Sequence, residues 1–399
     1  MGHVPQNRNP CSRPRHLYYQ FQTRMDPVLS FVIHEILPTE ILPTEILEII
    51  FEEHARLEWR APTIDGRVCR LWRRIVLNTP RAWAYLRIPR FYVPSIGELR
   101  LRLHRSSTAS LHIDTRAVRR SACQKLYNAF SDHHTRIASL RTQYSSQSFF
   151  EGRDFPCMRL LDVAEWYPVR WGSMPKLQSL QLSAYMSHMV PLSELAPLNT
   201  LALSCVKCAL VLRHSQSLTT LMLSDVVLVD AITGPVTFPS LTYLSLLSVR
   251  GLKPQVNAPR LVTYHEEGYM ARESFNLSLP SLVEYGLYHP TARDVDPATW
   301  HLPFPNIQRL AIRADDLVLL SFLTSLANQP HSLPALQTIS VGNPDARSYR
   351  IAESVRERIE SLVLVRNEAC NVNIMLFFES VAPFQIPIFF GAVSDLSVK

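Results

Sequence analysis

The sequence predicts an α/β protein in which a short helical segment precedes a curved solenoid with a parallel sheet. A proline-led unit with alternating apolar residues recurs from residue 156 to residue 341. Ahead of the first unit, apolar residues recur at helical spacing between residues 42 and 76. The chain of 399 residues also contains 29 prolines against 11 glycines, which is unusual for a compact α/β enzyme and indicates that prolines recur between its structural elements.

The repeated unit has the form Pro-x-apolar-x-x-apolar-x-apolar. The first apolar residue of each copy recurs at intervals of roughly 20 to 29 residues, which are the intervals of leucine-rich repeats. The copies are PCMRLLDV (156–163), PKLQSLQL (175–182), APLNTLAL (196–203), QSLTTLML (216–223), PSLTYLSL (239–246), PRLVTYHE (259–266), PSLVEYGL (280–287), PNIQRLAI (305–312) and PALQTISV (334–341).

Each unit predicts one strand with a single buried face, because its apolar and polar residues alternate with a period of two. The leading proline has no backbone N–H and fits just before a paired strand. One unit cannot cover its own apolar face, so the units are expected to stack as parallel strands. Two weaker copies, Ala109–Asp114 and Arg136–Arg141, are joined by a helix-like stretch at Val118–Phe130 and extend the solenoid upstream.

Two amphipathic helices are predicted ahead of the solenoid. Their apolar residues are Leu42, Ile46, Ile49 and Ile50 in the first helix and Val68, Leu71, Trp72, Ile75 and Val76 in the second. The expected organisation is a disordered basic N-terminus (1–35), a helical segment (36–93), the repeat solenoid (94–365) and a C-terminal tail of undecided structure (366–399).

The stretches LPTEILEIIFEEH (42–54) and VCRLWRRIVLNTPRAWAYLRI (68–88) resemble the F-box-like segment of the large mushroom-type F-box families. Those families also carry irregular, proline-led leucine-rich repeats and a final helix that is similar to Ile351–Val363. The resemblance implies a substrate-receptor subunit of a Skp-cullin-F-box type ubiquitin ligase. It implies that residues 42–83 bind a Skp-family adaptor, which bridges to a cullin, while the solenoid binds a target protein.

Carried over onto this sequence, the resemblance implies these adaptor-binding residues: Leu42, Pro43, Ile46, Ile50, Phe51, Val68, Cys69 and Trp72. Between the two helices, Ala61–Gly66 is read as a polar linker, shorter than in those families. The alternative hypothesis is therefore a scaffold or sensor built on the solenoid that acts outside ubiquitination.

Target binding is expected on the open face of the curved sheet, where solenoids present repeated side chains. In the early units the outward positions hold small residues: Thr200, Ala202, Ser204, Thr220 and Ser224. In the later units they hold aromatic and charged residues, which dominate binding energy at interfaces. The expected target-binding residues are Tyr243, His265, Glu284, Tyr288, Arg309 and Arg313; solvation of the sheet alone is the competing interpretation.

Glu266 occupies an inward apolar position that Leu246 and Leu287 fill in the neighbouring copies. A buried, unpaired carboxylate costs several kcal/mol. We therefore expect a break in the sheet between Tyr264 and Gly268, with Glu266 turned toward solvent or a basic partner.

No enzyme, cofactor or metal site is predicted. The chain lacks a Gly-rich phosphate loop, a Gly-x-Ser-x-Gly elbow and a His-Glu-x-x-His motif. The pairs Cys205/Cys208 and His133/His134 lack the further ligands of a zinc site, and the cysteines are read as packing residues.

No nucleic-acid or membrane partner is expected either. The net charge is +7, but the basic stretches at 67–74 and 100–105 alternate with apolar residues like solvated helix faces. The apolar stretch 375–393 is interrupted by Glu379 and two prolines, which argues against a membrane span. Seven scattered cysteines and a polar N-terminus predict a cytoplasmic or nuclear protein.

Overall fold

The computed structural model describes residues 42–90, 92–144, 147–166, 173–184, 189–190, 197–208, 216–228, 236–249, 256–267, 279–288, 306–329, 333–342, 353–370 and 374–378. The chain divides into two compact units, one ending at Ala82 and the other beginning at Trp83. The expected N-terminal segment 1–35 and most of the tail after residue 378 lie outside the described residues.

The first unit is helical. Its helices are α2 (Thr44–Leu57), α3 (Ala61–Asp65) and α4 (Arg70–Leu77), and the 3₁₀ helix η1 (Pro80–Trp83) follows them. One face of α2 is buried through Leu47, Phe51 and Ala55, and α4 contributes Ile75 and Val76 to the same core. The stretch read as a polar linker differs from that prediction, because it forms α3 and buries Ala61, Pro62 and Asp65.

The second helix starts later than predicted. Val68 precedes it, and Cys69 is its N-cap, with the sulfur accepting a hydrogen bond from the Trp72 backbone N–H at 3.4 Å. A side chain that caps a helix satisfies a donor that the first turn leaves open. Cys69 therefore caps the helix start and is exposed within this chain, whereas the sequence prediction had the helix include Val68.

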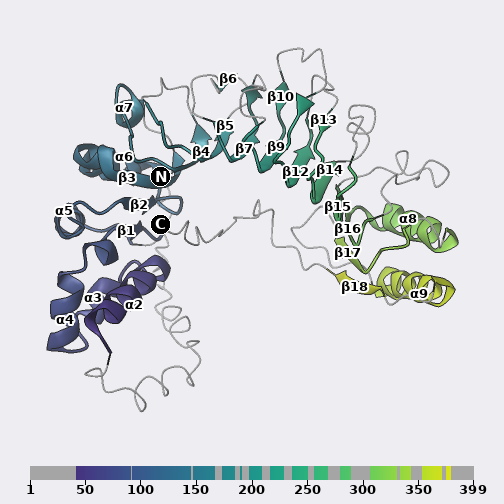
Figure 1. The fold of residues 1–399 in the computed structure, drawn as a ribbon, viewed down its shortest axis with the longest axis horizontal. Helices are drawn as coiled ribbons and strands as arrows, with labels where there is room; N and C mark the ends of the chain where they lie inside the picture. Colours follow the sequence, from purple (N-terminus) through teal and green to yellow (C-terminus); the bar gives the residue numbers. More distant parts are fainter. Residues whose placement is uncertain are drawn as a thin grey trace, which may run out of the picture. The chain divides into compact units, whose positions relative to one another are not determined.

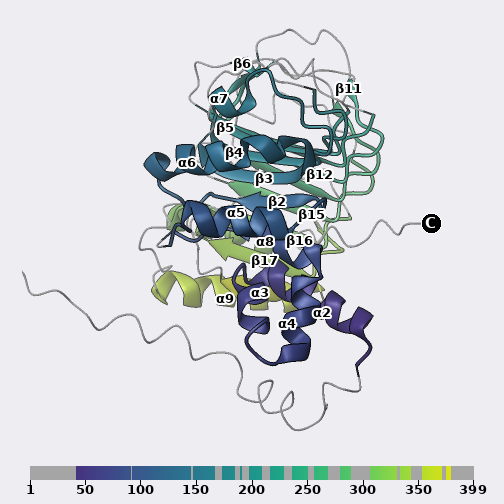
Figure 2. The same ribbon diagram turned by 90° about the vertical axis from the view of Figure 1, so that its left-hand side faces the viewer.

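The second unit is a solenoid of stacked coils built on one parallel, 13-stranded sheet (Figures 1 and 2). In spatial order its strands are β1 (Tyr85–Arg87), β2 (Leu111–Asp114), β3 (Ile137–Tyr144), β4 (Leu160–Trp166), β5 (Ser179–Ala184), β7 (Thr200–Ser204), β9 (Thr220–Ser224), β12 (Tyr243–Leu247), β14 (Thr263–Glu267), β15 (Glu284–Tyr288), β16 (Arg309–Arg313), β17 (Thr338–Gly342) and β18 (Met375–Phe378). The sheet starts at β1, before the expected solenoid start at residue 94, and β18 continues it into the segment read as a tail.

Short strands and helices complete the coils. The short strands pair as β6 (Met189–Val190), β8 (Lys207–Cys208) and β10 (Val227–Leu228), and as β11 (Val236–Thr237) with β13 (Val256–Asn257). The helices of this unit are α5 (Ile96–Arg105), α6 (Arg120–Phe130), η2 (Ser131–Arg136), α7 (Gln147–Phe150), α8 (Asp316–Asn328) and α9 (Glu353–Cys370).

The core of the solenoid is a stack of aliphatic rows. Register pairs Leu201 with Leu221 and Leu203 with Leu223, and all four side chains are buried. The period-2 alternation read from the sequence therefore gives one buried and one open face to each strand. After β7, β9 and β12 the chain turns through a left-handed residue: Cys205, Asp225 and Ser248 have φ values of 55°, 52° and 52°.

The later part of the sheet is covered by α8 and α9 (Figure 1). Arg366 of α9 is only 2% exposed, and its guanidinium donates to the carbonyl oxygens of Leu326, Gln329 and Leu333. Carbonyl groups at a helix end lack partners inside the helix. The buried guanidinium from α9 thus supplies hydrogen bonds to the carbonyl groups at the end of α8 and joins the two helices.

Candidate functional site

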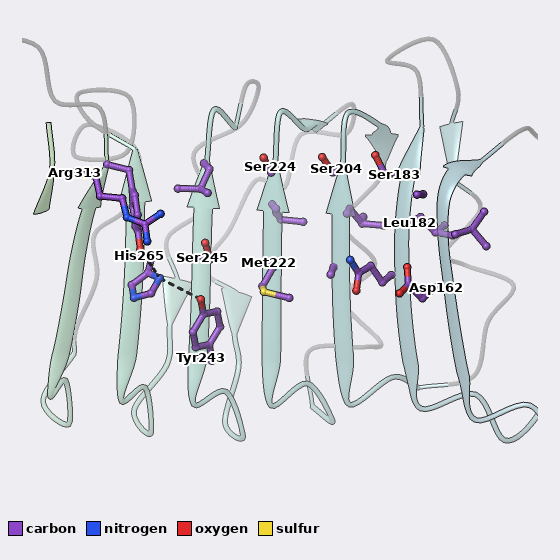
Figure 3. A pocket seen from close by; sticks show the side chains of 18 of the residues that line it. Asp162, Leu182, Ser183, Ser204, Met222, Ser224, Tyr243, Ser245, His265 and Arg313 are labelled. Carbon is purple, nitrogen blue, oxygen red and sulfur yellow. Dashed lines mark hydrogen bonds between the residues drawn. The ribbon is translucent and has the colours of Figure 1, made fainter. Parts of the chain in front are cut away.

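The open face of the sheet carries a trough of about 490 Å³ that runs from β4 to β16 (Figure 3). Between β7 and β12 the floor of the trough is formed by the outward side chains of Ala202, Met222 and Ser245. A row of hydroxyl groups follows one side of this floor: Ser183, Ser204 and Ser224. Of the small outward residues expected in the early units, Ala202, Ser204 and Ser224 line the trough, whereas Thr200 and Thr220 do not.

The late end of the trough is a cluster centred on His265. Its Nδ1 lies 3.1 Å from the Tyr243 hydroxyl and 3.4 Å from the Tyr288 hydroxyl, and its Nε2 lies 3.4 Å from Glu284 Oε1. The carboxylate can only accept, so Nε2–H donates to Glu284 and Nδ1 accepts from the tyrosines. Arg309 contacts the other oxygen of Glu284 at 3.2 Å, which closes the network.

The six residues predicted for target binding come together in this cluster. Arg313 completes it, with its guanidinium carbon 5.1 Å from the centroid of the Tyr288 ring. The side chains come from β12, β14, β15 and β16. Register places Glu284 beside Arg309 and Tyr288 beside Arg313, whereas Tyr243 and His265 lie at other positions of their units. All six share the open face because the period-2 alternation of each strand turns them to the same side.

Gly286 is a part of this cluster that the sequence interpretation missed. It pairs with His265 across β14 and β15, and a Cβ at Gly286 would lie 2.5 Å from Cδ2 of the imidazole. The imidazole ring occupies the space that any other residue would fill. A glycine at an outward strand position, next to a histidine in the preceding repeat, is the signal that could have revealed this contact.

The cluster shifts the ionisation of two of its members. The hydrogen bond from His265 lowers the pKa of Glu284; burial opposes this shift, and the charge of Arg309 adds to it. Burial raises the pKa of Tyr243, and the neighbouring Tyr288 and Glu284 raise it further. Glu284 is therefore held as a carboxylate and Tyr243 as a neutral phenol.

The early end of the trough contains a second polar group that sequence reasoning did not find. Arg116 bridges Asp114 at 2.8 Å and Asp162 at 3.4 Å. Burial raises the pKa of Asp162 to about 6, although Arg116 and Arg141 oppose the shift. The sequence hides this group, because the strand β3 and the helices α6, η2 and α7 lie between Arg116 and β4, which carries Asp162.

Glu266 contradicts the predicted break in the sheet. β14 continues regularly through Glu267, and Glu266 keeps the register of Leu246 and Leu287. Its carboxylate points into the core, is 5% exposed, and accepts hydrogen bonds from the hydroxyl groups of Tyr264, at 3.0 Å, and Tyr285. Most repeats have leucine at the position of Tyr264 and Tyr285, and only these two units have tyrosine there. That difference in the sequence could have revealed the partners of Glu266.

The residues predicted for adaptor binding differ in their exposure. Pro43, Ile46, Ile50, Val68 and Cys69 are exposed, and Leu42 is half-buried. Phe51 is only 1% exposed and packs edge-on against Trp72, with ring centroids 5.0 Å apart. These two rings therefore hold α2 against α4, while the exposed set forms the surface of the first unit.

The structure assigns no metal centre to the described residues: none of their His, Cys, Asp and Glu side chains gather in groups of three or more. Cys208 pairs with Leu228 through β8 and β10, and its side chain lies outside the described part. Cys205 occupies a left-handed turn and is half-buried. His134 contacts the Ser131 carbonyl through Nδ1 at 2.8 Å.

Comparison of the chain with protein-family models, curated proteins and solved structures found no match. Among the described residues, no helix combines the length and the apolar character needed to cross a membrane.

Proposed function

We propose that this protein is a non-enzymatic substrate receptor of a Skp-cullin-F-box type ubiquitin ligase. In this proposal the first unit binds a Skp-family adaptor, which links it to a cullin, and the open face of the solenoid binds the target protein. The resemblance of residues 42–54 and 68–88 to mushroom-type F-box segments supports the first half.

The observation that carries the proposal is the apolar surface of α2. Ile46, Ile49 and Ile50 are 43%, 56% and 43% exposed, while Leu47 and Phe51 on the other side of the helix are buried. Exposed apolar residues that cluster on one face mark protein interaction sites. An amphipathic helix that presents such residues at i, i+3 and i+4 fits a helical partner.

The solenoid supports the second half of the proposal. A stacked repeat offers an extended open face, and the trough on this face has the aromatic and charged cluster around His265 at its late end. Tyr243, Tyr288 and Arg313 belong to residue types that contribute most to binding at protein interfaces.

Co-purification with a Skp-family adaptor tests the proposal. The full chain is expected to retain the adaptor, and Ile50→Glu is expected to abolish retention, because it places a charge in the apolar surface. Ile50 is exposed, so the substitution leaves the core of the first unit intact. Leu101→Glu is the matched control, since Leu101 on α5 is an exposed apolar residue, 48% exposed, that lies outside residues 42–83.

Equal retention by the wild type and Ile50→Glu would contradict adaptor binding through α2. Loss of retention with both substitutions would indicate non-specific adhesion. If the wild type retains no adaptor, the remaining function is the scaffold or sensor role built on the solenoid.

A further inference from the structure

The trough on the open face is long and narrow. It is lined by residues of consecutive strands of the 13-stranded sheet, from β4 to β16. Neighbouring strands lie about 4.8 Å apart, so the trough extends over roughly 30 Å. A volume of about 490 Å³ spread over that length is a shallow channel. Its shape suits a linear chain better than a compact small molecule.

The lining chemistry favours a polypeptide over other linear ligands. The serine row Ser183, Ser204 and Ser224 and the amide of Gln181 can bond to backbone N–H and C=O groups, whereas Ala202 and Met222 form an apolar floor. An acyl chain would displace water from these hydroxyl groups without offering them a hydrogen bond. The contacts that Ser204 and Ser224 already make are long, at 3.6 Å to Cys205 Sγ and 3.5 Å to Asp225 Oδ2. A nucleic acid requires clustered cations along the phosphates, and Arg313 is the only Lys or Arg among the described residues that line the trough.

The two ends of the trough differ in the groups they offer. The lining carboxylates are already paired, Asp162 with Arg116 and Glu284 with Arg309. At the β15–β16 end, Arg313 lines the trough beside the phenol of Tyr288. The Tyr288 hydroxyl already donates to His265, but a guanidinium carries five N–H donors, so Arg313 makes this end favour an acceptor, and a carboxylate gains the most from it.

We propose that the trough receives an extended peptide segment of the target protein, uncharged along its middle and acidic where it reaches Arg313. The segment crosses the strands and places small or aliphatic side chains over Ala202 and Met222. A trough of this length holds about nine extended residues, at ~3.3 Å for each residue. This inference rests on the proposed function of the solenoid in protein recognition and is independent of the adaptor.

A random library of twelve-residue peptides, selected on beads against the full chain, tests the inference. Wild-type protein is expected to enrich sequences with an uncharged stretch followed or preceded by Asp or Glu. Fluorescence anisotropy then measures the affinity of the selected peptides. A labelled single-stranded oligothymidylate of similar length is measured in parallel.

Three variants locate the peptide. Met222→Trp fills the floor and is expected to weaken binding by at least roughly tenfold. Thr220→Trp is its matched control, because Thr220 lies on β9 on the same face but does not line the trough. Arg313→Glu is expected to replace the acidic preference of the library by a basic one. Circular dichroism confirms that each variant is folded.

Absence of enrichment, unchanged affinity in Met222→Trp, an unchanged acidic preference in Arg313→Glu, or tighter binding of the oligonucleotide would each overturn the inference. Adaptor retention measured on the same variants separates this inference from the proposed function. If the adaptor is retained but the peptides fail these criteria, the trough assignment fails while the adaptor assignment stands.

Discussion

Glu266 is a carboxyl group held within a core that is otherwise built from leucine rows. Two hydroxyl groups, from Tyr264 on its own strand and Tyr285 on the next, donate to its two oxygens. Net hydrogen-bond energies are modest, but the loss of one partner in a buried pair costs more than the bond itself contributes. The stability of this site therefore depends on all three side chains together.

Glu266→Leu is expected to lower the free energy of unfolding by about 1–3 kcal/mol, because it removes the acceptor for both buried hydroxyl groups. Adding Tyr264→Phe and Tyr285→Phe to the same chain is expected to restore most of that loss, since no polar group then loses its acceptor. Urea unfolding of the wild type, the single variant and the triple variant measures the difference. A triple variant less stable than Glu266→Leu would show that the tyrosines act independently of the carboxylate.

At the scale of the element, α2 and α4 depend on the contact between Phe51 and Trp72. Both helices belong to the compact unit that ends at Ala82. Trp72 is half-buried, and its Nε1 is buried without a hydrogen-bond partner among the described residues. The indole therefore stabilises the unit through its ring area and not through its N–H group.

Trp72→Ala is expected to destabilise the first unit by about 2–4 kcal/mol, because it removes most of an aromatic ring from a small core. Hydrogen exchange followed by mass spectrometry should show faster exchange in α2 and α4 and unchanged exchange in β5 to β12. Trp72→Phe is the control, since it keeps a ring and removes the unpaired N–H. Faster exchange across the solenoid strands would instead show that the two units unfold together.

At the scale of the whole molecule, buried acids make stability depend on pH. Burial raises the pKa of Asp162 in the solenoid to about 6 and also raises the pKa of Asp65 in the first unit, where His54 opposes the shift. In the window between the ordinary value of 3.8 and about 6, folded Asp162 holds a proton that the unfolded chain has released. The free energy of unfolding therefore decreases as the pH rises through this window.

Asp162→Asn removes this titration and is expected to flatten the pH dependence, with a gain of ~1–2 kcal/mol relative to the wild type between pH 5 and pH 7. Urea unfolding across this range measures the effect. Glu284→Gln is the control, because the pKa of Glu284 is lowered and its contribution is lost only as the pH falls below its ordinary value of 4.5. An equal slope in the wild type and Asp162→Asn would contradict the raised pKa.

The amino-acid sequence by itself determined the solenoid and the face on which each repeat residue lies. Period-2 alternation is a local property, so it predicts that Leu201 faces inward and Ala202 outward without knowledge of any partner. The same alternation predicts that Tyr243, His265 and Tyr288 share the open face, although they occupy three different positions of their units.

Only the tertiary structure decided how polar and glycine residues are paired between repeats. Glu266 meets Tyr285, His265 lies over Gly286, and Arg116 reaches Asp162, in each case between side chains from different repeats. The division of α2 into a buried Phe51 and an exposed Ile49 likewise depends on where α4 packs. The local period of the chain decides which face of the sheet a side chain lies on. The register and the reach of side chains between neighbouring coils decide which residues contact one another, and a single repeat contains neither.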